Sequence, residues 1–431
     1  MKKIDVAIKR YTLVVLMSAL FCGANAQDYD KYFTAQRLRI DVVFAGDASS
    51  QSVYLNSLHK EQLWSGSRVN LKDPFYYGEY HYRVMTKSGE EIFSKGFNSL
   101  FQEWRTTSEA KESRKAFECS YWIPFPKESV VVVFYERDKQ SGEFREMGRF
   151  PVDPADKLIN QEIQNSYKID TILYNGASSN KVDLVFIAEG YTAQQMDKFC
   201  MDAERFAGYL FDIEPYKSRK SDFNIWAVLS ESQDSGTDIP QQDIWRRTAV
   251  SSNFYTFRID RYLTAPNQRI VASAASNSNC DALYVIVNTE KYGGGGIFNF
   301  YGLSMSDHKH SAQVFVHELG HSFAGLGDEY YSSEVAYEEF YNLKVEPWEP
   351  NITTMVNFAG KWRDMISAGV PQPTPNDPAY KNITGLFEGG GYMAKGIFRP
   401  YLDCRMKTNT AEGFCPVCSR AINLMIDYYT K

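Results

Sequence analysis

The sequence predicts a multi-domain protein of the α+β class, in which an all-β sandwich precedes a domain of alternating strands and helices. Short strand-like runs dominate residues 32–150, and strands alternate with helices beyond residue 167. The length of 431 residues suggests more than one domain. A hydrophobic content of 44%, with 15% aromatic residues, is ample for sizeable cores.

The first 26 residues have the pattern of an export signal. Lys2 and Lys3 give a positive start, an apolar run covers residues 13–22, and Ala24-Asn25-Ala26 matches a signal-peptidase site. We therefore expect cleavage after Ala26 and a secreted, periplasmic or cell-surface bacterial protein. The apolar run is too short to cross about 30 Å of hydrocarbon, so we expect no membrane span.

Residues 27–155 are predicted to form the β-sandwich, as an accessory domain. Residues 79–85 and 91–93 flank Ser88-Gly89, which indicates a hairpin, and residues 130–135 form an apolar strand. Strands at roughly ten-residue spacing are typical of a sandwich. This part of the chain contains no cluster of metal ligands or nucleophiles.

Residues 156–431 are predicted to form the second domain, of α/β type. Strands are expected over residues 182–188, 223–229 and 282–287, and Thr192 is expected to cap a helix that runs past residue 206. Residues 293–296 are four consecutive glycines. Such a run is too rich in glycine for a helix or a central strand, so we expect a mobile loop there.

The strongest chemical signal is a helical stretch over residues 311–323. His317 and His321 stand four residues apart, so both rings lie on one helix face and can bind one ion. Glu318 is offset from His317 by about 100°, where it can act as a base without being a ligand. An exposed polar stripe is the alternative, but the surrounding residues are apolar. The pattern indicates a catalytic Zn²⁺ site with Glu318 as the catalytic base.

A catalytic zinc needs a third protein ligand, which we expect after the helix. Gly325 permits a turn, and Asp328 follows His321 by seven residues, so we favour Asp328. Two alternatives are open. One is Glu329, and the other is a later glutamate, namely Glu334, Glu338 or Glu339.

These residues resemble the metzincin zinc peptidases, in which the third ligand follows a glycine turn. Here one extra residue precedes the glycine. The chain is more similar to the bacterial IgA metalloendopeptidase family, over roughly residues 181–427. The segments that carry this resemblance are residues 185–191, the Gly-Asp-Glu-Tyr run at 327–330, residues 388–392 and residues 404–406. The resemblance implies an α/β zinc-peptidase fold with Met406 beneath the zinc and a preceding accessory domain. Immunoglobulin cleavage is known only of some members and is not carried over.

Three further residue groups give weaker expectations. Tyr392 follows a glycine run, which favours it over Tyr330 and Tyr331 as a catalytic hydrogen-bond donor. Six cysteines remain after the signal, and those near the C-terminus indicate a local disulfide or buried thiols; three cysteines without a histidine make a poor zinc set. The net charge of −6, without a basic stripe, argues against nucleic acid as a partner.

The sequence therefore predicts a secreted zinc endopeptidase acting on proteins or peptides. A zinc amidase acting on cell-wall peptides is one alternative, and a non-catalytic surface binding protein is another. The retained Glu318 disfavours the second, because binding alone does not require a base. The oligomeric state and the physiological substrate are not indicated by any motif.

Overall fold

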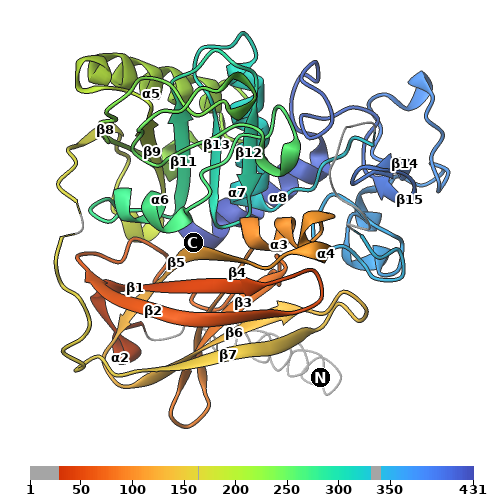
Figure 1. The fold of residues 1–431 in the computed structure, drawn as a ribbon. Coiled ribbons are helices and arrows are strands. Elements are labelled where there is room, and N and C mark those ends of the chain that lie inside the picture. The colour runs from red at the N-terminus through yellow and green to blue at the C-terminus, as the bar shows by residue number, and fades with distance from the viewer. Residues whose placement is uncertain (1–28, 164, 332–340) are drawn as a thin grey trace, which may run out of the picture.

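The computed structural model describes residues 29–163, 165–331 and 341–431. The expected signal peptide and the alternative ligands Glu334, Glu338 and Glu339 lie outside these ranges. The described chain is a mixed α+β protein with several sheets and a β-rich N-terminal part, as predicted (Figure 1). None of its helices within these ranges is long and apolar enough to cross a bilayer.

Two antiparallel sheets form the N-terminal part, with strand orders β2-β1-β5 and β4-β3-β6-β7 (Figure 1). Their strands are β1 (Phe33–Gly46), β2 (Gln51–Glu61), β3 (Tyr80–Thr86), β4 (Glu91–Phe97), β5 (Lys115–Pro126), β6 (Val130–Arg137) and β7 (Phe144–Val152). Short helices accompany them, namely α2 (Tyr29–Tyr32), α3 (Leu100–Trp104) and α4 (Glu109–Glu112). The helices α3 and α4 depart from the all-β expectation. Helix α3 forms because the Ser99 hydroxyl accepts a hydrogen bond from the Gln102 amide and caps its first turn.

Aromatic side chains join these two sheets. Phe44 of β1 contacts Tyr80 of β3 at 5.1 Å between ring centroids, and Tyr121 of β5 contacts Phe97 of β4 at 4.2 Å. All four rings are buried. Tilted ring pairs of this kind add to the stabilisation from apolar burial. The expected hairpin is confirmed, since β3 and β4 pair on either side of Ser88-Gly89.

A six-stranded sheet of order β12-β13-β11-β9-β10-β8 organises the second part. Its strands are β8 (Ile169–Leu173), β9 (Val182–Glu189), β10 (Phe223–Val228), β11 (Ala282–Val287), β12 (Gly294–Ile297) and β13 (Tyr301–Met305). The four inner strands are parallel and the two edge strands are antiparallel. The three strands predicted from the sequence correspond to β9, β10 and β11. A separate hairpin consists of β14 (Phe387–Gly390) and β15 (Met393–Arg399).

The inner strand β9 is buried on both faces, so its alternate residues serve different cores. Leu184 and Phe186 belong to the core formed with helices α5 (Met196–Phe211), α7 (Ser311–Ala324) and α8 (Pro416–Thr430). Val185 and Ile187 belong to the core shared with α6 (Gln268–Ala274) and the N-terminal sheets. The expected cap at Thr192 is present as a capping box in the turn that leads into α5.

The glycine run at residues 293–296 is not the loop that we expected, because most of it forms the edge strand β12. Hydrogen bonding to β13 fixes this strand, and α7 packs directly against it. A β-carbon at Gly296 would lie 2.3 Å from the Glu318 carbonyl oxygen, and one at Gly294 would lie 2.9 Å from Glu318 Oε1. The glycines therefore permit close packing of a strand on a helix, which a local propensity argument does not detect.

Candidate active site

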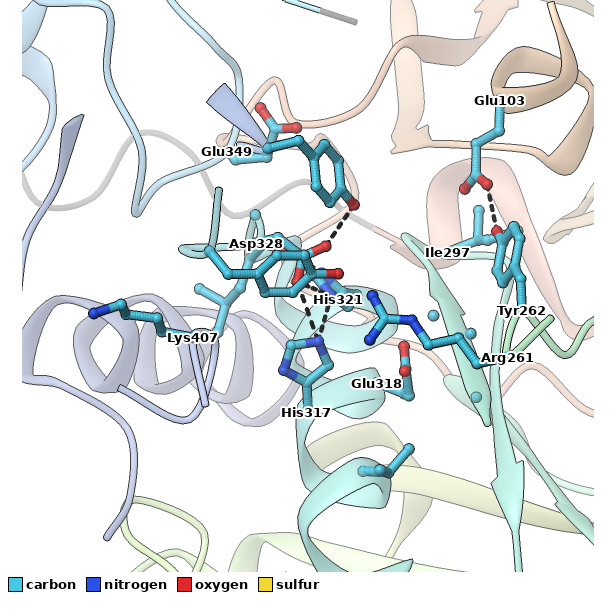
Figure 2. A pocket seen from close by; sticks show the side chains of 18 of the residues that line it. Glu103, Arg261, Tyr262, Ile297, His317, Glu318, His321, Asp328, Glu349 and Lys407 are labelled. Carbon is cyan, nitrogen blue, oxygen red and sulfur yellow. Dashed lines mark hydrogen bonds and ion pairs between the residues drawn. The ribbon is translucent and has the colours of Figure 1, made fainter. Parts of the chain in front are cut away.

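Helix α7 has one apolar face and one face that carries two imidazoles. Phe315 and Leu319 are buried in the core beneath the helix, whereas the side chains of His317 and His321 keep 15% exposure each. The two Nε2 atoms lie 3.1 Å apart. The i, i+4 spacing places both rings on one helix face, where they point toward a common position (Figure 2).

A glycine turn brings a carboxylate to the same position. Helix α7 ends at Ala324, and its C-cap Gly325 has the left-handed φ of +65°. Asn351 holds the next part of the turn, because its side chain accepts a hydrogen bond from the Gly327 amide and donates one to the Gly327 carbonyl. Asp328 is thereby placed with Oδ1 3.2 Å from Nε2 of His317 and 3.2 Å from Nε2 of His321.

The outer nitrogens of both imidazoles are paired with backbone carbonyls. Nδ1 of His317 lies 3.0 Å from the Arg405 carbonyl oxygen, and Nδ1 of His321 lies 2.5 Å from that of Leu326. Each Nδ1 must carry a proton to donate these bonds, so Nε2 is the nitrogen through which each ring would bind a metal. Ligand atoms bound tetrahedrally at 2.0–2.1 Å lie about 3.3 Å apart, which matches the spacing here. His317, His321 and Asp328 thus form a group of suitable geometry for a metal ion.

The charges of this group are strongly coupled. Burial alone would lower the pKa of His321, but the Asp328 carboxylate outweighs it and raises the pKa to about 9. Burial would raise the pKa of Asp328, but His321 and His317 hold it far below its usual range. A buried carboxylate is therefore ionised next to two imidazoles. A divalent cation bound among them would replace the proton that this cluster otherwise attracts.

Glu318 lies beside this group and is not part of it. Its carboxylate faces β12, and Arg261 extends toward it across the cleft (Figure 2). Burial raises the pKa of Glu318, with the Asp328 charge adding to the effect and the two histidines and Arg261 opposing it. A carboxylate with a raised pKa is a stronger base than an exposed one.

Tyr392 reaches the site from the β14–β15 hairpin. Its hydroxyl donates a hydrogen bond to Oδ2 of Asp328, and its backbone amide donates to the Tyr330 carbonyl at 2.9 Å. Tyr392 has a φ of +67°, a left-handed conformation held by these contacts. The ring of Tyr330 is nearly parallel to that of His317 at 6.5 Å. Tyr330 and Tyr331 line the same cleft.

The cleft around these residues has a volume of about 480 Å³. Arg261, Asn351 and Trp348 are site components that the sequence did not indicate. Arg261 follows an irregular segment containing several left-handed residues, so no periodic pattern marks it. The Asn351 contact joins two turns that are distant in sequence, and only the folded chain brings them together.

Two other residues singled out by the sequence lie next to the site. Met406 is fully buried, and its Sδ would lie 2.8 Å from a β-carbon at Gly320, so it packs against helix α7. Glu329 points away from the histidines. Its Oε1 lies 3.1 Å from Sγ of Cys418, and its amide donates to the Met406 carbonyl.

Comparison with known families identifies the class. Residues 171–382 and 376–426 match the family described as IgA Peptidase M64, and residues 28–147 match the one described as Peptidase M64 N-terminus. The chain is therefore a peptidase, an enzyme that acts on protein or peptide substrates. Within that class it belongs to the IgA peptidase M64 family, because the first match covers more than half of the chain. The resemblance inferred from its motifs is thus confirmed. No curated protein matches the chain.

Proposed function

We propose that this chain is a secreted, zinc-dependent endopeptidase with a metzincin-like catalytic domain. His317, His321 and Asp328 are the zinc ligands, and Glu318 is the catalytic base. One observation carries the proposal: three ligand atoms converge within 3.2 Å while both Nδ1 atoms are engaged by backbone carbonyls. Nitrogen and carboxylate ligands around an open position are typical of catalytic zinc.

The proposed zinc and the residues around it have separate roles in peptide hydrolysis. Bound zinc supplies a lowered water pKa, toward about 7, and polarises the scissile carbonyl. Glu318 takes the proton from the attacking water and passes it to the leaving amine. The single hydroxyl proton of Tyr392 bonds Oδ2 of Asp328 here, and we propose that it turns from Asp328 to the developing oxyanion during the reaction.

The domain arrangement and the export route belong to the same proposal. We assign residues 1–26 to a signal peptide, 27–155 to the accessory domain and 156–431 to the catalytic domain. The family matches support a division in this region, because one ends at residue 147 and the other begins at residue 171. Gly325 and Met406, which lie directly after and against α7, support a metzincin-like organisation.

Metal removal tests the cofactor. We expect a strong chelator to reduce peptide hydrolysis to background, and added Zn²⁺, but not Mg²⁺, to restore it, because imidazoles suit zinc better than magnesium. The unfolding temperature should also fall. Zinc at a thousand times its Kd stabilises the folded state by about 4 kcal/mol.

Hydrolysis of a peptide library is measured with the chelated and the reconstituted protein, with muropeptides in a parallel assay. Full activity in metal-free protein would contradict the proposal. Cleavage of muropeptides alone would favour the amidase alternative.

The tyrosine assignment has its own test. Tyr392→Phe removes one hydroxyl, and we expect kcat to fall by about 100-fold or more, as for loss of an oxyanion donor. KM should change little, since the ring remains. Turnover is compared at saturating zinc, because the Tyr392 hydroxyl also bonds the proposed ligand Asp328 and its loss weakens zinc binding.

Tyr331→Phe is the matched control, because Tyr331 lines the same cleft and is 39% exposed. A loss of turnover in Tyr331→Phe with normal turnover in Tyr392→Phe would reassign the donor.

A further inference from the structure

A second group of potential metal ligands lies behind the candidate active site. It consists of Glu329, Cys404, Cys415 and Cys418, which we call the cysteine cluster. All four residues are buried, and their ligand atoms lie within 4.8 Å of one another. Cys415 is the N-cap of α8 and Cys418 lies in its first turn, whereas Glu329 arrives from the turn after α7.

The spacing of the ligand atoms fits a tetrahedral ion. Sγ of Cys404 lies 3.8 Å from Sγ of Cys418, and Oε1 of Glu329 lies 3.1 Å from Sγ of Cys418. Sulfurs that bind zinc tetrahedrally at 2.3 Å are about 3.8 Å apart. A disulfide requires about 2.05 Å, and all six cysteines of the described residues are free thiols.

Backbone amides point at two of the sulfurs. The Cys415 amide donates to Sγ of Cys404 at 3.2 Å, and the Cys418 amide donates to Sγ of Cys415 at 3.4 Å. These contacts favour the thiolate form, which is the form that binds metals. The N-terminus of the 15-residue helix α8 adds a favourable electrostatic field for negative charge at this position.

Within the part of the chain that the structure describes, the carboxylate of Glu329 has one oxygen without a partner, and only the charges of Arg399 and Lys407 act on it from a distance. The residue has no exposed surface, and among the described residues its Oε2 has no hydrogen-bond partner. Its Oε1 accepts a hydrogen bond from the Asn351 amide nitrogen at 3.0 Å. Burying a carboxylate with an unpaired oxygen is costly unless a positive charge lies nearby.

We propose that Glu329, Cys404, Cys415 and Cys418 bind a second, structural Zn²⁺. Three thiolates and one carboxylate complete four-fold coordination and leave no open position, as in structural zinc sites. This ion would link three parts of the chain, namely the turn after α7, the segment before Met406, and α8. Asn351 connects this site to the first, since its side chain also holds the turn that presents Asp328.

Metal and thiol analysis of the purified protein tests the proposal. We expect two zinc ions per chain, and every cysteine thiol reactive once the unreduced protein is denatured. His317→Ala/His321→Ala should retain the cysteine-cluster zinc alone. Cobalt substitution should give a thiolate-to-cobalt charge-transfer band, which the histidine–aspartate site cannot produce. One zinc per chain without that band, or two missing thiols, would overturn the proposal.

Variants assign the second zinc to these residues. Cys415→Ser/Cys418→Ser should lose one zinc and the charge-transfer band, and Cys200→Ser, a cysteine of α5 outside the cluster, should lose neither. If the double variant does not fold, Glu329→Gln provides the milder change. It should weaken only the zinc that gives the charge-transfer band, in competition with a chelator. An unchanged band and affinity in Glu329→Gln would exclude Glu329 as a ligand.

Discussion

Replacing Glu318 with glutamine is expected to abolish peptide hydrolysis while leaving zinc in the active site. General acid–base catalysis contributes about 10²- to 10⁴-fold to rate, and no described carboxylate outside the ligand group replaces Glu318 on the α7 face (Figure 2). The proposed ligand atoms belong to His317, His321 and Asp328, so the substitution removes none of them.

The folded state should not suffer from this substitution. Burial opposes the ionised form of Glu318, so a neutral amide of the same shape is tolerated at least as well. We therefore expect an unchanged or slightly higher unfolding temperature, together with normal zinc content. Glu128→Gln, an exposed glutamate between β5 and β6, is the matched control and should keep normal activity. Near-normal hydrolysis by Glu318→Gln would rule out the proposed mechanism.

Asp328→Asn is expected to weaken zinc binding by more than about 100-fold, since loss of even an outer-shell partner costs about 10- to 100-fold. Asparagine keeps the shape of the side chain but removes the charge that lies 3.2 Å from both Nε2 atoms. Two imidazoles alone do not hold a catalytic zinc. Activity should therefore be lost at low zinc and partly recovered when zinc is added in excess.

The same substitution predicts a titration effect in the metal-free protein. The Asp328 charge raises the pKa of His321 to about 9 against the opposing effect of burial. Without it, His321 should lose its proton at a lower pH, which NMR of the imidazole can follow. Asp156→Asn, an exposed aspartate, is the control for both measurements. If Asp328→Asn kept the active-site zinc and Glu329→Gln lost that same zinc, Glu329 would be the third ligand in place of Asp328.

Much of the framework was predictable because it depends on local periodicity. The apolar residues around His317 and His321 indicated helix α7, and the short apolar runs indicated β9, β10 and β11. The glycine after α7 also predicts a turn, and this turn favours Asp328 as the third ligand. In each case the residues that make up the pattern belong to the predicted helix, strand or turn itself, or to the element next to it in the sequence.

The remaining features depend on contacts between distant segments. The glycine run became strand β12 because of its pairing with β13 and its packing on α7, neither of which a local pattern contains. The three C-terminal cysteines alone are a poor zinc site, because they supply only three ligands. The proposed fourth ligand, Glu329, comes from a turn that is distant in sequence. Arg261 reaches the cleft from an irregular segment, so its position depends on the tertiary fold alone.

The close packing of β12 on α7 also restricts how this enzyme can select its substrates. Gly294, Gly295 and Gly296 line the cleft with main chain only, and added β-carbons there would collide with neighbouring atoms. On this side of the cleft a bound peptide therefore contacts main-chain atoms only, and these contacts do not distinguish one substrate side chain from another. Discrimination among peptides falls to the bulky and charged residues elsewhere on the rim, such as Arg261, Trp348 and Lys407. Divergence in cleavage preference within the family should accordingly concentrate at those positions while the glycine strand stays constant.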